Sequence, residues 1–166
     1  MNVKQSTLLL AAAAVTILNF ESCKKYEDGP LFSLRSKKAR LTGEWELVKI
    51  NGQNPNEYLS NNGGYSYYNS NRVITNFSSE WDFEDDNDFS RNTSFTVTTS
   101  YTNWYGYTYT VDNDYNNSES GDWDWEDNKQ DIEIRTNRII SEYEILKLTN
   151  NELKLEYGGT EFEFEK

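Results

Sequence analysis

The chain has 166 residues, of which 36% are hydrophobic and 15% aromatic, so we expect one domain with a core of large rings. Its 28 acidic and 16 basic residues give a net charge of −12, which repels nucleic-acid phosphates and excludes nucleic-acid binding. The chain has no histidine and a single cysteine, which excludes Ser–His and Cys–His catalysis, an internal disulfide and a zinc site built from His and Cys.

The first 22 residues have the pattern of a secretory signal peptide. Lys4 supplies a positive charge, and residues 7–18 form an apolar run that is shorter than the roughly 20 residues needed to span a bilayer. Ser22, a small residue, directly precedes Cys23. This arrangement resembles the lipobox of bacterial lipoproteins, in which the cysteine is lipidated and becomes the first residue of the mature chain. The alternative is that Cys23 is an ordinary buried or free thiol.

The charged segment after Cys23 is similar to the corresponding segment in surface lipoproteins of Bacteroidetes-type bacteria. The resemblance implies a lipid anchor, such as palmitate, in the outer membrane of a Gram-negative bacterium, with the protein on the periplasmic face or at the cell surface. We therefore expect a signal peptide at residues 1–22, a tether with a short helix or turn at 23–40, and a folded domain at 41–166.

The first strand of the domain is expected within residues 41–50. Gly43, Trp45 and Leu47 alternate with Glu44 and Glu46, so one face of the strand is apolar and the other acidic. The Asn-Gly pair at residues 51–52 indicates a turn. Residues 58–77 are rich in Asn, Ser, Gly and Tyr and are expected to form a long loop with a weak strand at 72–75.

Short alternating stretches separated by turn residues predict the other strands. They are expected at residues 80–84, 94–101, 107–111, 121–126, 131–135, 139–149, 152–157 and 160–165. The polar stretch 112–120 is expected to be a loop, and residues 103–106 a hairpin turn. In the longest strand the alternation changes face near Ile145 and Leu146, which indicates a β-bulge.

No helical pattern separates these strands, so the sheet is expected to be an antiparallel meander with one apolar face. Such a sheet must close on itself or pack on a second sheet. We predict an all-β fold, an up-and-down β-barrel of about eight strands, because closure removes the sheet edges. A two-sheet β-sandwich is the alternative.

Several motifs carry a resemblance to a known family. Gly43 and Trp45 match the Gly-x-Trp motif in the first strand of lipocalins, and further landmarks lie at residues 121–125, 145–153 and 162–164. Over residues 41–166 the chain is similar to the lipocalin-like domain of Bacteroidetes lipoproteins. The resemblance implies a barrel that binds a small apolar ligand or an envelope component. It also implies an Arg from a late strand over Trp45, for which the sequence offers no clear candidate.

The expected interior of the barrel is the first candidate site. Its candidate ligand-binding residues are Trp45, Leu47, Trp81, Phe83, Trp123, Trp125, Phe162 and Phe164. Barrels of about eight strands either fill with side chains or hold one small ligand. The many bulky rings favour a filled interior, and both alternatives stay open.

Aromatic residues in polar loops form the second candidate site, with Tyr67, Tyr68, Trp104 and Tyr105 as candidate interaction residues. Aromatic rings among polar neighbours are typical of recognition surfaces, where they stack on sugar rings or contact a protein. Packing between strands and anchoring of the loops is the alternative role.

No catalytic residue, metal ligand or cofactor is predicted. The acidic stretches near 82–88 and 112–114 lack the Gly turn and terminal Glu of a calcium loop, so we interpret them as solvated turns. Nothing singles out a carboxylate pair for glycoside hydrolysis, which leaves a carboxylate-based hydrolase as a remote alternative. We expect a non-catalytic, membrane-tethered protein that binds a small apolar ligand or an envelope component. The alternative is a surface interaction module with a solid barrel, whose Tyr- and Trp-rich loops contact a glycan or a protein.

Overall fold

The computed structural model describes residues 35–62, 70–127, 130–137 and 139–166. These ranges contain the helices α2 (Lys37–Leu41) and α3 (Pro55–Asn62) and eight strands. The strands are β1 (Gly43–Ile50), β2 (Ser70–Phe83), β3 (Asp88–Thr102), β4 (Thr108–Glu126), β5 (Asp131–Thr136), β6 (Ile140–Leu148), β7 (Glu152–Tyr157) and β8 (Thr160–Glu165). The expected signal peptide, Cys23 with most of the tether, and the candidate residues Tyr67 and Tyr68 lie outside the described residues.

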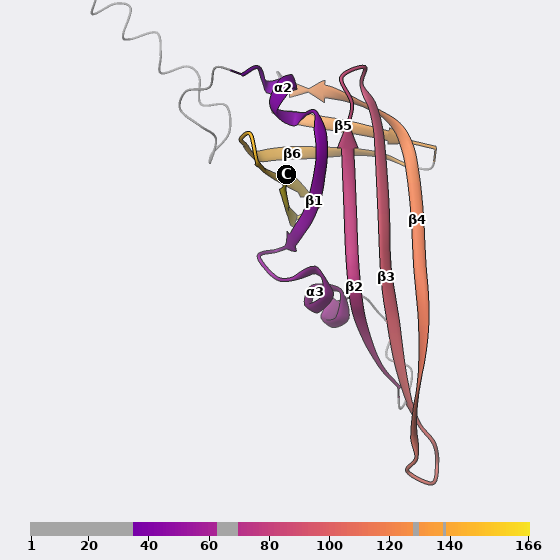
Figure 1. The fold of residues 1–166 in the computed structure, drawn as a ribbon. Helices are drawn as coiled ribbons and strands as arrows, with labels where there is room; N and C mark the ends of the chain where they lie inside the picture. Colours follow the sequence, from indigo (N-terminus) through magenta and orange to yellow (C-terminus); the bar gives the residue numbers. More distant parts are fainter. Residues whose placement is uncertain (1–34, 63–69, 128–129, 138) are drawn as a thin grey trace, which may run out of the picture.

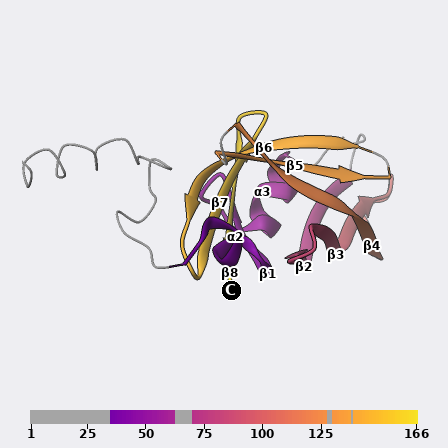
Figure 2. The same cartoon turned by 90° about the horizontal axis from the view of Figure 1, so that it is seen from above.

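The eight strands form a closed barrel in which each strand pairs antiparallel with the next one in the sequence. β8 returns to pair with β1, so that Phe164 lies opposite Leu47 and Phe162 opposite Ile50. Figures 1 and 2 show the strands enclosing a common interior from two directions. The fold is therefore the all-β, closed up-and-down barrel of eight antiparallel strands expected from the sequence, and the β-sandwich alternative is wrong.

The interior of the barrel is built by the alternation of large apolar residues with charged ones. In β1, Trp45 and Leu47 are buried whereas Glu44 and Glu46 are exposed, because successive side chains of a strand point to opposite faces. The same alternation in the other strands completes the core. Its buried members in these strands are Trp81, Phe83, Phe89, Trp123, Ile132, Ile134, Tyr143, Ile145, Leu148, Leu153, Leu155 and Phe164.

Aromatic rings contact one another across this interior. The centre of the Trp81 ring lies 5.5 Å from that of Tyr143 and 4.9 Å from that of Phe164. Phe89 meets the same indole edge-on at 5.6 Å. Aromatic pairs at these separations attract one another beyond the effect of burial alone. The rings therefore pack as one cluster in the middle of the barrel.

The short helix α2 closes one end of the barrel. It begins after Ser36, whose Oγ accepts a hydrogen bond from the backbone N–H of Ala39 at 3.1 Å. The buried Arg40 donates from Nη1 to the carbonyl oxygen of Leu148 at 2.8 Å, which fixes the helix to β6. In the described part of the chain, no helix combines the length and the apolar character that a membrane crossing requires.

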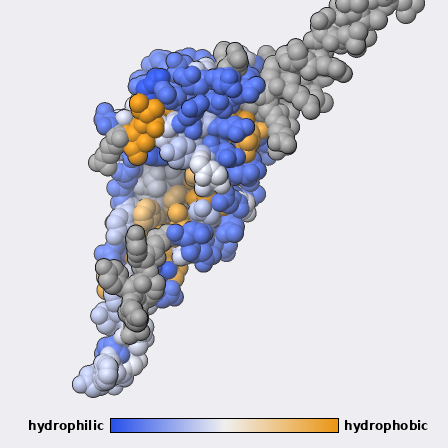
Figure 3. Space-filling view, turned by 180° about the vertical axis from the view of Figure 1, so that it is seen from behind, coloured by the Kyte–Doolittle hydropathy of each residue, from blue (hydrophilic) through white to orange (hydrophobic). Residues whose placement is uncertain are grey.

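Strands β2, β3 and β4 continue beyond the barrel as a three-stranded extension, which we call the arm (residues 70–79, 93–102 and 108–120). β1 pairs with β2 only at residues 80–83, and β5 pairs with β4 only at residues 121–126. Figure 1 shows the arm running down from the barrel to the β3–β4 hairpin, and Figure 3 shows it tapering to a narrow tip.

The arm corrects two expectations from the sequence. Residues 112–120, expected to be a loop, belong to β4, since β3 pairs with every one of them. Residues 58–77, expected to be mainly loop, include the second half of α3 and the first half of β2. The β-bulge expected near Ile145 is confirmed in β6 by a register shift between Ile145 and Lys147. The expectation that this strand is the longest is wrong, since β2, β3 and β4 are all longer.

Candidate functional site

The tip of the arm is an ordered hairpin that presents two large aromatic residues. The side-chain oxygen Oδ1 of Asn103 accepts hydrogen bonds from the backbone N–H groups of Tyr105 and Tyr107, each at 3.0 Å. Gly106 takes a positive φ of 84°, which favours glycine at this position of the turn. Trp104 is 95% exposed and Tyr105 82% exposed, so the turn holds both side chains out into solvent.

Behind the tip, one face of the arm carries stacked aromatic pairs. Tyr101 of β3 lies directly opposite Tyr109 of β4, with ring centres 5.3 Å apart and planes inclined by 22°. Nearer the barrel, Phe95 stacks in the same way on Tyr115 at 5.1 Å and 14°. Residues directly opposite each other in an antiparallel pair share a face, so these four rings lie on one side of the arm. We call this side the aromatic face.

The other side of the arm is polar. Thr96 donates from its hydroxyl to Asp114 at 2.8 Å, and Thr98 donates to Asp112 at 2.7 Å. Each of these pairs links β3 to β4, and both carboxylates are exposed. We call this side the hydroxyl face. It holds the two carboxylates in fixed positions while leaving most of their hydrogen-bonding capacity directed at solvent.

The base of the arm is fixed to the barrel by a half-buried cation. Arg91 of β3 forms an ion pair with Glu119 of β4, and its guanidinium lies 5.2 Å from the centre of the Trp81 ring. Ser118 donates to Asn92 at 2.7 Å one position further along the same pair of strands. These contacts join the arm to Trp81 in the core of the barrel, so that the arm extends from a rigid base.

The candidate residues of the barrel interior lie together, as the alternation indicated. Six of them, Trp45, Leu47, Trp81, Phe83, Trp123 and Phe164, are buried. Trp125 and Phe162 are half-buried and pack against the core cluster. Several of these side chains contact one another, as Trp81 does with Phe83 and Phe164, and their role as ligand-binding residues stays a prediction.

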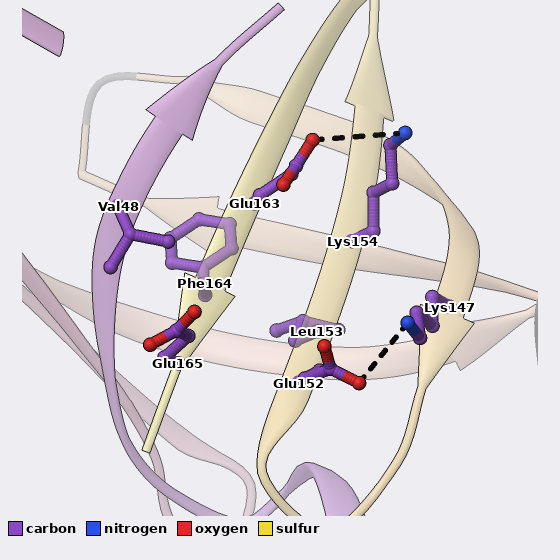
Figure 4. A pocket seen from close by; sticks show the side chains of 8 residues that line it. All are labelled: Val48, Lys147, Glu152, Leu153, Lys154, Glu163, Phe164 and Glu165. Carbon is purple, nitrogen blue, oxygen red and sulfur yellow. Dashed lines mark ion pairs between the residues drawn. The ribbon is translucent and has the colours of Figure 1, made fainter. Parts of the chain in front are cut away.

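A hollow of about 220 Å³ is lined mainly by charged side chains of β6, β7 and β8 (Figure 4). Within it, Lys147 Nζ lies 3.1 Å from Glu152 Oε2, and Lys154 Nζ lies 3.9 Å from Glu163 Oε1. Both lysines are therefore neutralised by carboxylates of the same protein. This arrangement supports the strand pairing and does not present a cation to an anionic ligand.

The acidic β2–β3 turn concentrates negative charge. The pKa of Glu84 is raised, first by repulsion from Asp86 and then by burial and by repulsion from Asp82 and Asp88. Over the described ranges no group of three or more Asp, Glu, Cys or His side chains is arranged to hold a metal ion.

Sequence reasoning found Trp104 and Tyr105, and Tyr101 and Tyr109 behind them, but missed the stacked pair nearer the barrel. Phe95 and Tyr115 were not expected to pair, because residues 112–120 were interpreted as a loop. For the same reason, Asp112 and Asp114 were not expected to lie side by side on one face of a strand. A signal was present, since Thr and Tyr are common in the stretch 94–111 and favour strands, but it stopped where Asp and Asn become frequent.

No protein-family model matches this chain, and no curated protein matches it in sequence. Two crystal structures from Bacteroides species are similar in fold. A lipocalin-like protein from Bacteroides uniformis ATCC 8492 shares 16% identity at a TM-score of 0.40, and the match covers 76% of this chain and 98% of that one. An uncharacterized protein from Bacteroides eggerthii DSM 20697 shares 14% identity at a TM-score of 0.40, with the same coverage of 76% and 98%.

Proposed function

We propose that the protein is a non-catalytic recognition module of a bacterial envelope, tethered by a lipid on Cys23, that binds a protein or a glycan through its arm. The observation that carries this proposal is the exposure of Trp104 and Tyr105, 95% and 82%, on a hairpin whose turn is fixed by Asn103. A turn whose backbone is already fixed loses little backbone entropy on binding, and exposed aromatic residues supply large contact areas.

The aromatic face extends this surface toward the barrel. Tyr109 is 56% exposed, and Tyr107 and Tyr115 are also exposed. Val97 and Thr99, between the two stacked pairs, are buried, so the exposed part of the aromatic face lies at these tyrosines. Exposed aromatic residues that gather in this way are typical of surfaces that bind a partner. Tyrosine also carries a hydroxyl, so it serves a contact surface that must stay compatible with water when it is empty.

The barrel serves as the rigid base of the arm in this proposal. Its interior rings contact one another, with Trp45 and Phe83 fully buried. A small apolar ligand inside the barrel would have to displace such rings, which costs their mutual packing. The packed interior therefore favours recognition by the arm over a ligand held inside.

The position of the tether fits the same proposal. The described chain begins beside α2, at the end of the molecule opposite the β3–β4 hairpin (Figure 1). A lipid on Cys23 would hold that end near a membrane. The tip with Trp104 would then point away from the membrane surface, where a partner can reach it.

Cosedimentation with envelope fragments of the bacterium that makes the protein tests this function. The full chain is used with Cys23→Ala, so that no lipid anchor carries it into the pellet. We expect this protein to cosediment and the additional pair Trp104→Ala and Tyr105→Ala to abolish cosedimentation. The pair Ile139→Ala and Ile140→Ala is the matched control, because it removes two side chains that are 58% and 65% exposed elsewhere on the barrel. Equal cosedimentation of the arm variant and the control would refute the proposal.

The nature of the partner follows from treating the fragments before the assay. Protease digestion removes a protein partner and leaves glycans, whereas periodate oxidation destroys glycan rings and leaves proteins. Loss of cosedimentation after one treatment alone identifies the class of molecule that the arm binds.

A further inference from the structure

The outer edge of β4 is open along the whole arm. Residues 108–120 pair with β3, and among the described residues no strand pairs with their other side. β5 joins β4 only from Gly121 onward. An open edge presents a row of backbone N–H and C=O groups to solvent, which is a template for another strand.

The register of β4 with β3 shows which backbone groups point outward. On the β3 side, the N–H of Asn103 donates to the carbonyl of Tyr107, and the N–H of Trp123 donates to the carbonyl of Asn87, each at 2.9 Å. Hydrogen-bonded positions alternate along an antiparallel strand, and both positions on the β4 side are odd-numbered. The N–H and C=O groups of the even-numbered residues from Thr108 to Ser120 therefore point to the open edge.

The opposite edge of the arm is protected. The N–H of Ile74 in β2 donates to Ser60 Oγ at 2.8 Å, and the N–H of Phe77 donates to Asn56 Oδ1 at 3.0 Å, so α3 caps this edge. A register shift between Thr75 and Ser78 bends it further. Residues 108–120 contain no Pro, Lys or Arg, and their register with β3 is unbroken. Sheet edges are normally protected by such devices, and among the described residues the edge of β4 has only its negative charges, with no covering helix and no bulge.

The side chains along this edge indicate what would pair with it. Asp112 and Asp114 belong to the outward-facing positions and project on the hydroxyl face, whereas Val111 and Tyr109 project on the aromatic face. A strand added here would place its own alternate side chains beside the two carboxylates, where Lys or Arg is favoured. A second copy of the chain would bring further carboxylates to the same edge of a protein with a net charge of −12.

We propose that the edge of β4 binds an extended, cationic segment of a partner protein by strand addition. Lys or Arg side chains of that segment lie beside Asp112 and Asp114, and its intervening apolar side chains extend the aromatic face. This inference rests on the proposed recognition function and names the partner as a protein. Main-chain hydrogen bonds supply affinity in this mode, and side chains supply specificity.

Binding of synthetic peptides to the full chain with Cys23→Ala tests the inference. The probe is a fluorescent peptide of alternating Lys and Val, and a Glu–Val peptide is its charge control. A Lys–Val peptide with N-methyl groups at every second residue keeps the charge but cannot form the ladder. We expect only the unmodified Lys–Val peptide to bind.

Variants of the protein test the role of the two carboxylates. We expect Asp112→Asn with Asp114→Asn to weaken binding of the Lys–Val peptide about threefold to tenfold, since each surface charge contributes modestly. Asp124→Asn, in the part of β4 that is paired with β5, is expected to leave binding unchanged.

Amide hydrogen exchange gives a readout by position. Bound peptide is expected to slow exchange at Thr110, Asp112 and Asp114, and to leave Val111 and Asn113 unchanged, since only the even positions face the edge. The inference is overturned by binding of the N-methylated peptide with equal affinity, by equal affinity of the Asp112→Asn and Asp114→Asn variant, or by self-association that protects the even-numbered amides without peptide.

The two proposals fail separately. The pair Trp104→Ala and Tyr105→Ala leaves the open edge intact, so this variant is expected to bind the Lys–Val peptide as the wild type does. Absence of peptide binding in a protein whose cosedimentation still depends on Trp104 overturns strand addition alone. Cosedimentation that is independent of Trp104 overturns the recognition function of the tip.

Discussion

The ammonium group of Lys166 lies 4.4 Å from the centre of the Trp45 ring. The same group donates to the carbonyl oxygen of Arg40 at 3.1 Å, and Trp45 donates from Nε1 to the carbonyl oxygen of Leu41 at 2.6 Å. The last residue of the chain thus joins the first strand to α2. The lipocalin resemblance implied an Arg over Trp45, and a Lys occupies that place here.

Replacing Lys166 tests the strength of this closure. We expect Lys166→Ala to lower the free energy of unfolding by about 0.5–1 kcal/mol, the range for a cation–π contact whose cation is exposed to solvent. Lys166→Arg keeps a cation in the same position and is expected to retain most of that stability. Urea unfolding followed by tryptophan fluorescence measures both. Lys49→Ala, which removes an exposed ion pair with Glu163, is the control. An equal loss of unfolding free energy in Lys49→Ala would show that the contact of Lys166 with Trp45 stabilises the fold no more than an exposed ion pair does.

The barrel could be predicted because each of its strands has one apolar face and one charged face. Phe162 and Phe164 alternate with glutamates, and Trp45 and Leu47 do the same at the other end of the domain. A period of two that persists through short stretches divided by turn residues indicates half-buried antiparallel strands. The closed barrel follows from the number of strands and the need to cover one apolar face.

The arm could not be predicted in the same way, because its edge strand β4 is exposed on both faces over most of its length, although Val97 and Thr99 of β3 are buried. Residues 112–118 of β4 are all exposed, so no alternation of apolar and polar residues marks them as a strand. Asp and Asn are depleted in strands and common in turns, which favoured a loop. The pairing with β3 decided the structure instead, through a register that runs without a break from Asp88 to Thr102.

Substitution of two tryptophans of this chain is expected to change the free energy of unfolding by very different amounts. Trp81 is buried and contacts Phe89, Tyr143 and Phe164, so Trp81→Ala is expected to cost about 3–5 kcal/mol of stability. Trp104 is 95% exposed, and Trp104→Ala is expected to change stability by less than about 0.5 kcal/mol. Thermal or urea unfolding of both variants measures the difference. A large loss in Trp104→Ala would show that the tip is a structural element.

Gly121 marks the point where the arm meets the barrel, and it has no room for a side chain. A Cβ there would lie 1.8 Å from the carbonyl oxygen of Arg135 in β5. Gly121→Ala is therefore expected to force β4 and β5 apart and to destabilise the barrel by more than about 2 kcal/mol, because the obstacle is backbone. Gly106→Ala at the tip meets no atom within 4 Å and is expected to cost only about 1 kcal/mol, for its positive φ. Similar unfolding midpoints for the two variants would contradict the close approach at residue 121.

Asp131 opens β5 opposite Glu126 of β4 and Glu144 of β6, so three acidic residues meet on the outside of the barrel. Burial, followed by repulsion from Asp127, Glu142, Glu144 and Glu126, raises the pKa of Asp131 above its ordinary value of 3.8. The folded state thus favours the protonated form. Its stabilising contribution is complete below pH 3.8 and is lost as the pH rises through the higher pKa of the folded protein.

Asp131→Asn removes the charge at all pH values and is expected to raise stability at neutral pH, with an advantage that disappears below pH 3.8. Added salt is expected to reduce the part of the gain that comes from repulsion, because it screens exposed charges. Urea unfolding at neutral and acidic pH, at low and high salt, measures these changes. Asp112→Asn on the arm is the control for a general reduction of net charge. An equal gain from Asp112→Asn, or an advantage of Asp131→Asn that persists at low pH, would show that repulsion within the barrel wall is not the cause.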